Sequence, residues 1–130
     1  MARQPDTVTT EYIEAYRLGV LIRTPIENVA FFRAEDKAVV AFTKAGGQFT
    51  LDVPLCRITS TLEGQFLLVE RSHLVQIALL PGLKHFRQGS HWVFEIITYE
   101  RIGTRMGLLP TIIPVSRRLT QKVKACLAAI

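Results

Sequence analysis

The sequence lacks most of the features that mark secreted, membrane and metal-binding proteins. Its 130 residues include only two cysteines, Cys56 and Cys126, at no spacing that suits a metal site, so we expect two reduced, buried thiols. No apolar run is long enough for a transmembrane helix, and even IALLPGL is short and interrupted by proline and glycine. The N-terminal stretch MARQPDTVTTEY has no apolar segment of the kind that a secretory signal needs. These absences predict a cytoplasmic protein without membrane insertion.

Catalytic motifs are also missing. Ser72 and His73 are adjacent, but neighbours on an extended strand point to opposite faces and cannot form a nucleophile–base pair. The sequence contains no G-x-S-x-G, no phosphate-binding glycine loop and no H-E-x-x-H, and its three histidines have no regular spacing. We therefore expect neither an enzyme nor a bound cofactor or metal.

The chain does have enough apolar residues for one domain, and its charge is unevenly distributed. Hydrophobic residues make up 48% of the chain, which excludes a disordered segment. Residues 1–83 carry eight Lys and Arg against nine Asp and Glu, a net charge of −1, whereas residues 84–130 carry eight against two, a net charge of +6. A basic C-terminal part suggests binding to nucleic acid or another anionic surface; the alternative is a basic soluble domain.

Short apolar segments separated by turn residues indicate an all-β, mainly antiparallel protein. Residues 9–18 fit either a short helix or an extra strand, and residues 24–28 fit a single tight turn. Residues 101–110, RIGTRMGLLP, are expected to form a basic, glycine-containing loop. The expected strands are 19–24, 29–33, 37–43, 48–53, 65–69, 74–80, 83–87, 92–100 and 111–115.

Two helices are expected. Residues 54–64 place apolar side chains at helical spacing between a proline and a glycine, which predicts a short internal helix. Ser116 is a good N-cap for a C-terminal helix. Arg117 and Arg118 would fall in its first turn, where the helix dipole disfavours cations, so they either hold a phosphate or are merely exposed. The apolar stripe of this helix comprises Leu119, Val123, Cys126, Leu127 and Ile130.

The polar run Glu70, Arg71, Ser72 and His73 interrupts one of the most apolar parts of the chain. Burying charges without partners is unfavourable, so we expect the strand to leave the core here. Alternation along residues 66–69 would place apolar side chains on both faces of a sheet. Glu70 and Arg71 would then be surface charges, or would pair with groups elsewhere.

Three segments follow one another in a distinctive order: VAFFRAEDKAVVAF (29–42), QFLLVERSHLVQIALL (65–80) and IPVSRRLTQKVKACL (113–127). Their order and spacing resemble those of the LytTR family, the DNA-binding domains of bacterial transcription regulators. The resemblance covers residues 17–128 and divides the chain into an N-terminal extension, 1–16, and a LytTR-like domain, 17–130. Family members usually carry a receiver or sensor domain upstream, and 16 residues are too few for one.

The resemblance implies an elongated stack of small antiparallel sheets with one short internal helix and a C-terminal helix. It implies binding to duplex DNA through loops and strand ends that enter successive major grooves and bend the DNA. The implied partner is promoter DNA with direct repeats, bound by separate copies or by a homodimer. The positions that match the family's contact regions lie in one turn, RAEDKA (33–38), and in two corners, at residues 70–72 and 116–118. The candidate DNA-binding residues there are Lys37, Glu70, Arg71, Ser72, His73, Ser116, Arg117 and Arg118.

Departures from the family pattern leave some roles open. Glu70 stands where the family usually has histidine, and Gln76 where asparagine is usual. A carboxylate at position 70 either accepts from cytosine N4 and shifts the preferred sequence, or orients Arg71 through an ion pair. The stretch 101–110 is longer than is typical, and Arg101 and Arg105 in it would add DNA contacts. Alternatively, an oligomer contact would form through Met106, Leu108 and Leu109.

A second function is consistent with the same pattern. The chain would then be a non-catalytic interaction module, such as an antagonist that binds a regulatory protein partner and does not bind DNA specifically. Internal ion pairs between Glu70 and the arginines at positions 71, 117 and 118 would favour this alternative. Arg71 free to contact guanine would favour a sequence-specific DNA-binding regulator.

Overall fold

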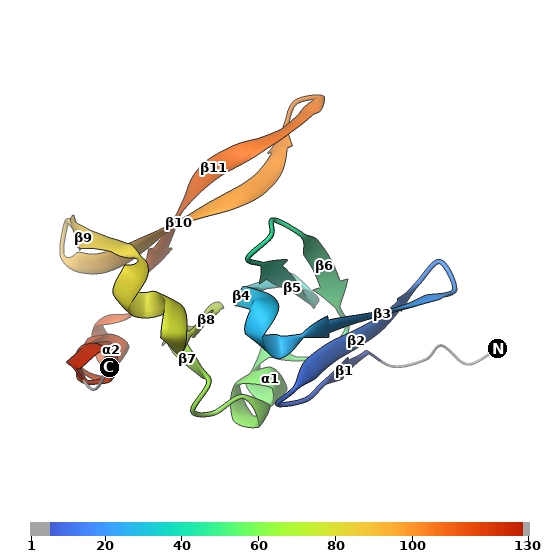
Figure 1. Cartoon of the computed structure of the whole chain (residues 1–130). Coiled ribbons are helices and arrows are strands. Elements are labelled where there is room, and N and C mark those ends of the chain that lie inside the picture. The colour runs from blue at the N-terminus through green and yellow to red at the C-terminus, as the bar shows by residue number, and fades with distance from the viewer. Residues whose placement is uncertain (1–5, 129–130) are drawn as a thin grey trace.

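The chain forms three small antiparallel sheets that follow one another along the sequence (Figure 1). The computed structural model describes the backbone of residues 6–128, and the side chains of the same residues except 99–102 and 106. One short helix follows the sixth strand, and a second helix lies at the C-terminal end. These elements confirm the predicted all-β, mainly antiparallel fold with one short internal helix and a C-terminal helix. No helix in the described part of the chain is long and apolar enough to cross a membrane.

The first sheet contains the segment that the sequence left open between helix and strand. Its strands are β1 (Thr7–Val8), β2 (Tyr12–Arg17) and β3 (Val20–Pro25), in the order β1-β2-β3. Ile13 and Ala15 are 0% and 2% exposed, and the side chains on either side of them are less covered. This period of two suits a strand. Residues 7–16, expected as an extension, therefore pair into the same sheet as β3, and the domain boundary at residue 17 stays a prediction.

The central sheet carries most of the core on its two faces. Its strands are β4 (Val29–Glu35), β5 (Ala38–Thr43), β6 (Gln48–Leu51), β7 (Phe66–Glu70) and β8 (His73–Gln76), in the order β6-β5-β4-β8-β7. Phe32 packs into one core cluster, whereas Phe31 packs into the other and stacks on Phe42, with ring centroids 4.4 Å apart. Alternation along residues 66–69 is confirmed, because these side chains divide between the same two clusters.

The short internal helix covers the first of these clusters. Helix α1 (Leu55–Thr61) buries Ile58 completely, and Leu62 just beyond it is also 0% exposed. The sequence predicted this helix correctly. It did not predict the exposure of Cys56, which lies on the solvent side of α1, so the expectation of a buried thiol there is wrong. Both cysteines are free thiols.

Two short 3-10 helices connect the sheets. The first, η1 (Ile26–Asn28), is the tight turn expected at 24–28. The second, η2 (Ile77–Gly82), replaces the C-terminal half of the strand expected at 74–80, because β8 ends at Gln76. The helical segment contains Pro81, which has no N–H to donate to a sheet ladder.

The third sheet contains a long two-stranded ribbon where the sequence suggested a loop. Its strands are β9 (Lys84–Gln88), β10 (His91–Ile102) and β11 (Arg105–Pro114), in the order β11-β10-β9. Pairing of β10 with β11 runs from Val93–Pro114 to Ile102–Arg105, around a turn in which Gly103 adopts a φ of 64°. The expected loop at 101–110 is therefore wrong. Strand β9 pairs only with residues 91–95, so beyond residue 95 the ribbon of β10 and β11 projects from the body (Figure 1).

The chain then enters a 3-10 turn before its last helix. This turn, η3 (Arg117–Leu119), leads directly into α2 (Thr120–Ala128). Ser116 precedes the turn, but its side chain makes no capping hydrogen bond. Instead, the Thr120 hydroxyl donates to the Ser116 carbonyl over 3.0 Å. Arg117 and Arg118 therefore lie in the 3-10 turn and not in the first turn of α2. The expected apolar stripe packs on the second core cluster through Val123, Cys126 and Leu127, and its last member, Ile130, lies outside the described residues.

Candidate nucleic-acid interface

Two of the three predicted contact regions lie at one end of the central sheet. Antiparallel β4 and β8 are neighbours, with Arg33 opposite His73. The backbone N–H of Ala34 donates to the Ser72 carbonyl over 2.8 Å, just beyond the last paired residues. The turn that follows β4 and contains Lys37 therefore lies at the same end of the sheet as the corner at residues 70–73.

A backbone hydrogen bond brings the third predicted contact region, at residues 116–118, to the corner at residues 70–73. The N–H of Ser116 donates to the Val69 carbonyl over 2.8 Å. This bond holds the start of η3 beside the end of β7. A surface hollow of about 290 Å³ forms between the corner at residues 70–73 and a second corner at residues 116–118. The hollow is lined by Glu70, Arg71, His91, Pro114, Val115, Ser116 and Arg118.

Glu70 is bonded within its own corner. Its Oε1 atom accepts the backbone N–H of Ser72 over 2.9 Å and forms a short contact with His73 Nδ1. The side chains of Glu70 and His73 are 17% and 12% exposed, so water screens this pair only in part. The carboxylate thus fixes the turn from β7 to β8. The ion pair with Arg71 that the sequence left open is not formed.

The arginines of the two corners are available to a partner. Arg71, Arg117 and Arg118 are exposed, and the ion pairs of the described residues do not include them. Arg71 and Arg118 line the same hollow, so the packing brings them together from segments more than 40 residues apart. Unpaired arginines around one concave surface suit the phosphates and guanine edges of a duplex.

Lys37 lies in a more acidic neighbourhood. It is exposed in the turn after β4, next to Asp36, which takes a φ of 45°. Asp36 and Asp52 share a surface hollow with Lys37. These carboxylates offset the charge of Lys37, so this turn is less basic than the arginine corners.

Arg101 and Arg105 are separated from these corners. Both lie at the tip of the ribbon, where Arg105 is exposed and the side chain of Arg101 is outside the described residues. Strand β11 spans Arg105–Pro114, which corresponds to roughly 30 Å at about 3.3 Å per residue. The structure therefore groups eight of the ten predicted residues at one end of the molecule and places these two far from them.

His91 is the residue that sequence reasoning missed. It follows the turn between β9 and β10, opposite Gln88, and lines the hollow with Glu70 and Arg71. The sequence showed it only as one of three irregularly spaced histidines. Its position beside the corner depends on how the third sheet packs on the central one, which no local pattern reports.

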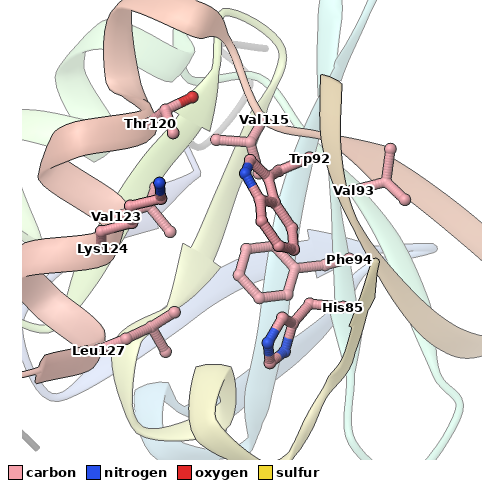
Figure 2. Close-up of a pocket in the computed structure, with 9 residues that line it drawn as sticks. All are labelled: His85, Trp92, Val93, Phe94, Val115, Thr120, Val123, Lys124 and Leu127. Carbon is pink, nitrogen blue, oxygen red and sulfur yellow. The ribbon is translucent and has the colours of Figure 1, made fainter. Parts of the chain in front are cut away.

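The last helix packs against the third sheet next to the second corner. Figure 2 shows Val123 and Leu127 of α2 facing Trp92 and Phe94 of β10 across an apolar cavity of about 150 Å³. The amine of Lys124 lies 5.8 Å from the centroid of the Trp92 ring. This packing positions η3, and with it the two arginines, relative to the third sheet.

Comparison with known proteins identifies the family and the fold of the chain. The family model of the LytTr DNA-binding domain matches residues 19–128. The chain belongs to the LytTR family. Its fold is similar to that of the LytTr DNA-binding domain of a methyl-accepting/DNA response regulator from Bacillus cereus, with a TM-score of 0.64 at 16% identity over 90% of this chain and 96% of that one. No curated protein matches the sequence.

Membership in the LytTR family assigns a DNA-binding role to the chain. The family is one of DNA-binding domains and not of enzymes. Within the described residues, no three His, Cys, Asp or Glu side chains come together in a group that could hold a metal ion.

Proposed function

We propose that this LytTR domain is a sequence-specific transcription regulator that inserts the adjacent corners at residues 70–73 and 116–118 into a major groove of duplex DNA. The observation that carries the proposal is the convergence of Arg71 and Arg118, both exposed and without ion pairs among the described residues, on one hollow. We expect the protein to act on promoter DNA in the bacterial cytoplasm.

Each corner residue has a role that its geometry supports. Arg71 contacts guanine O6 and N7, for which a bidentate guanidinium is suited. Arg117 and Arg118 hold phosphates or a second base edge, and Ser72 and Ser116 hold phosphates. Lys37 adds a phosphate contact, which must weaken as the salt concentration rises.

Glu70 and His73 shape the first corner. Because the Glu70 carboxylate already accepts the Ser72 N–H and contacts His73, we assign it to positioning Arg71 through the turn and not to reading cytosine. Because the ribbon tip lies far from the corners, we expect Arg101 and Arg105 to make only a secondary contribution, by attracting DNA electrostatically.

The alternative of an antagonist that does not bind DNA specifically has less support. It required Glu70 to neutralise the arginines, and Glu70 pairs with His73 instead. A regulatory protein partner remains compatible with DNA binding.

Selection from a random duplex pool with purified protein at near-physiological salt tests the proposal. Enrichment of a short motif, in two copies about one helical turn apart, is the expected result. Weak binding without enrichment, abolished as salt rises, would overturn sequence specificity and favour the interaction module.

A further inference from the structure

The three histidines of the chain differ in their surroundings. His73 Nδ1 contacts the carboxylate of Glu70. The ring of His85 lies 6.0 Å from the ring of Trp92, beside the apolar cavity next to α2 (Figure 2). Within the described part of the chain, no hydrogen bond, ion pair or ring contact includes His91. The ring nitrogens of His91 are therefore available to a partner from outside the chain.

The turn between β9 and β10 holds His91 at the surface. Gln88 and His91 pair as the last residues of the two strands, and the turn between them consists of Gly89 and Ser90. Gly89 takes a φ of 64°, which glycine adopts without steric cost. A turn of two residues fixes the register of a hairpin. His91 is exposed, so its side chain is presented to solvent from a backbone position that the third sheet determines.

Two successive backbone hydrogen bonds tie this turn to both corners. The N–H of Val115 donates to the carbonyl of Trp92, the residue after His91, over 2.7 Å. The N–H of the next residue, Ser116, donates to the carbonyl of Val69 over 2.8 Å. The start of β10, the second corner and the end of β7 are thus joined through the backbone. This arrangement explains why His91 lines the same hollow as the two corners.

The charged groups around this hollow are mainly cationic. Those that line it with His91 are Glu70 and Arg71 from the first corner and Arg118 from the second. Glu70 is already bonded to the turn of its own corner. On the third sheet, the guanidinium of Arg87 lies 5.9 Å from the centroid of the Trp92 ring. The sequence has no Asp or Glu from residue 71 to residue 94. The surroundings of His91 consequently attract anions.

Histidine is the side chain whose charge ordinarily changes between about pH 5 and about pH 8. A phosphate that meets an imidazole stabilises the protonated form, because opposite charges attract and the ring N–H donates to the phosphate oxygen. Binding of a phosphate by His91 would therefore be accompanied by uptake of a proton. The contribution to affinity is greatest at low pH and is lost as the pH rises and the complex gives up this proton.

We propose that His91 is a third point of DNA contact, at which the protonated imidazole binds a backbone phosphate next to the two arginine corners. The inference rests on the proposed function in taking those corners as the surface that faces DNA. A phosphate carries no base identity, so the contact should form on a duplex of any sequence. DNA binding by this chain should then depend on pH through one named residue.

The dependence of affinity on pH tests the contact. Binding of the full chain to a mixed-sequence duplex is measured at about pH 5.5 and about pH 7.5, on either side of the ordinary histidine range, at constant salt. We expect the parent to bind roughly tenfold more tightly at the lower pH, the size of one hydrogen bond to a charged group. His91→Ala should bind weakly at both pH values. The control His85→Gln should keep the parent's dependence, because His85 lies beside the α2 cavity.

A variant with a permanent charge separates this role from folding. Arginine stays charged at both pH values, so His91→Arg should bind tightly at both. Misfolding cannot produce such retained affinity. His73 is present in all these variants, so pH dependence that disappears in His91→Ala belongs to His91. The proposal would be overturned by an unchanged pH dependence in His91→Ala, or by weak binding of His91→Arg at the higher pH.

Proton uptake distinguishes this inference from the proposed function. Calorimetric titrations with the same duplex, in two buffers that differ in ionisation enthalpy, measure the protons bound with DNA. The parent should take up more than His91→Ala. An enriched motif without this difference would overturn the His91 contact alone. The difference without any enriched motif would support the contact and overturn sequence specificity. A reordered ranking of motif variants in His91→Ala would mean that His91 reads a base, which would overturn the phosphate contact.

Discussion

The backbone N–H of Ser116 donates a 2.8 Å hydrogen bond to the carbonyl oxygen of Val69. The two residues are 47 positions apart in the sequence and belong to segments of different sheets. Val69 is 0% exposed, so this bond is sheltered from water. It fixes the distance between Arg71, two residues after Val69, and the arginines that follow Ser116. The spacing of the two corners that we propose to bind DNA is thus set by a backbone hydrogen bond.

Replacing Arg71 by alanine should remove one base contact. We expect specific binding to weaken by about 1–3 kcal/mol, with relaxed preference at a single position of the motif. Titration of the parent and the variant with matched and single-mismatch duplexes measures both effects. Lys44→Ala is the control, because Lys44 is exposed at the opposite end of the central sheet and its replacement removes the same charge. Equal affinity of the Arg71 variant and the parent for the selected site would show that Arg71 has no reading role.

Glu70 should affect DNA binding by stabilising the fold of its corner and not by contacting a DNA base. Glu70→Ala removes the acceptor of the Ser72 N–H and the partner of His73, so we expect the free energy of unfolding to fall by about 1–3 kcal/mol. Affinity should fall uniformly over all motif variants. Urea denaturation and binding to a mismatch series measure the two effects. A changed motif with unchanged stability would instead assign Glu70 to base recognition. Glu63→Ala, in an exposed position, is the matched control.

Arg117 and Arg118 should contribute mainly to the dependence of binding on salt. Removing one arginine–phosphate interaction reduces the slope of log affinity against log salt concentration by about one. We therefore expect Arg117→Ala and Arg118→Ala to flatten this slope and leave the ranking of motif variants nearly unchanged. Titrations at several salt concentrations give the slope. A reordered ranking would mean that one of the two reads a base.

Weakening the packing of α2 should also loosen the second corner and reduce its affinity for DNA. Val123 is 4% exposed and lines the cavity between α2 and β10. Val123→Ala enlarges this cavity, and we expect the free energy of unfolding to fall by about 1–3 kcal/mol. Under conditions where the variant is still folded, its affinity for DNA should also fall, because η3 is held less firmly. Thermal unfolding and binding at low temperature separate the two effects. Full affinity in the destabilised variant would show that α2 does not position the arginines.

Local sequence patterns determined most of the strands, the two helices and the polar corner. Alternation of apolar residues on β4, β5 and β7 reflects the period of two that any half-buried strand must have. The polar run at residues 70–73 had to leave the core because burying unpaired charges is unfavourable. The order of three motifs was enough to indicate the LytTR family. Patterns failed where the chain has little periodicity, at residues 77–82, and where glycine could mark either a loop or a tight hairpin, at 101–110.

Only the tertiary structure decided which polar residues act together. The sequence left Glu70 either to accept from cytosine or to pair with Arg71. In the structure, the turn between β7 and β8 brings His73 and the Ser72 N–H to its carboxylate. Packing between sheets placed His91 and Arg118 at the same hollow as Arg71. Pairing of β10 with β11 formed the long ribbon, whose tip carries Arg105 far from that hollow. Such contacts join residues distant in the chain, and their formation depends on the whole core. Composition and spacing specify which side chains avoid water, but the packed sheets specify which of the exposed ones meet.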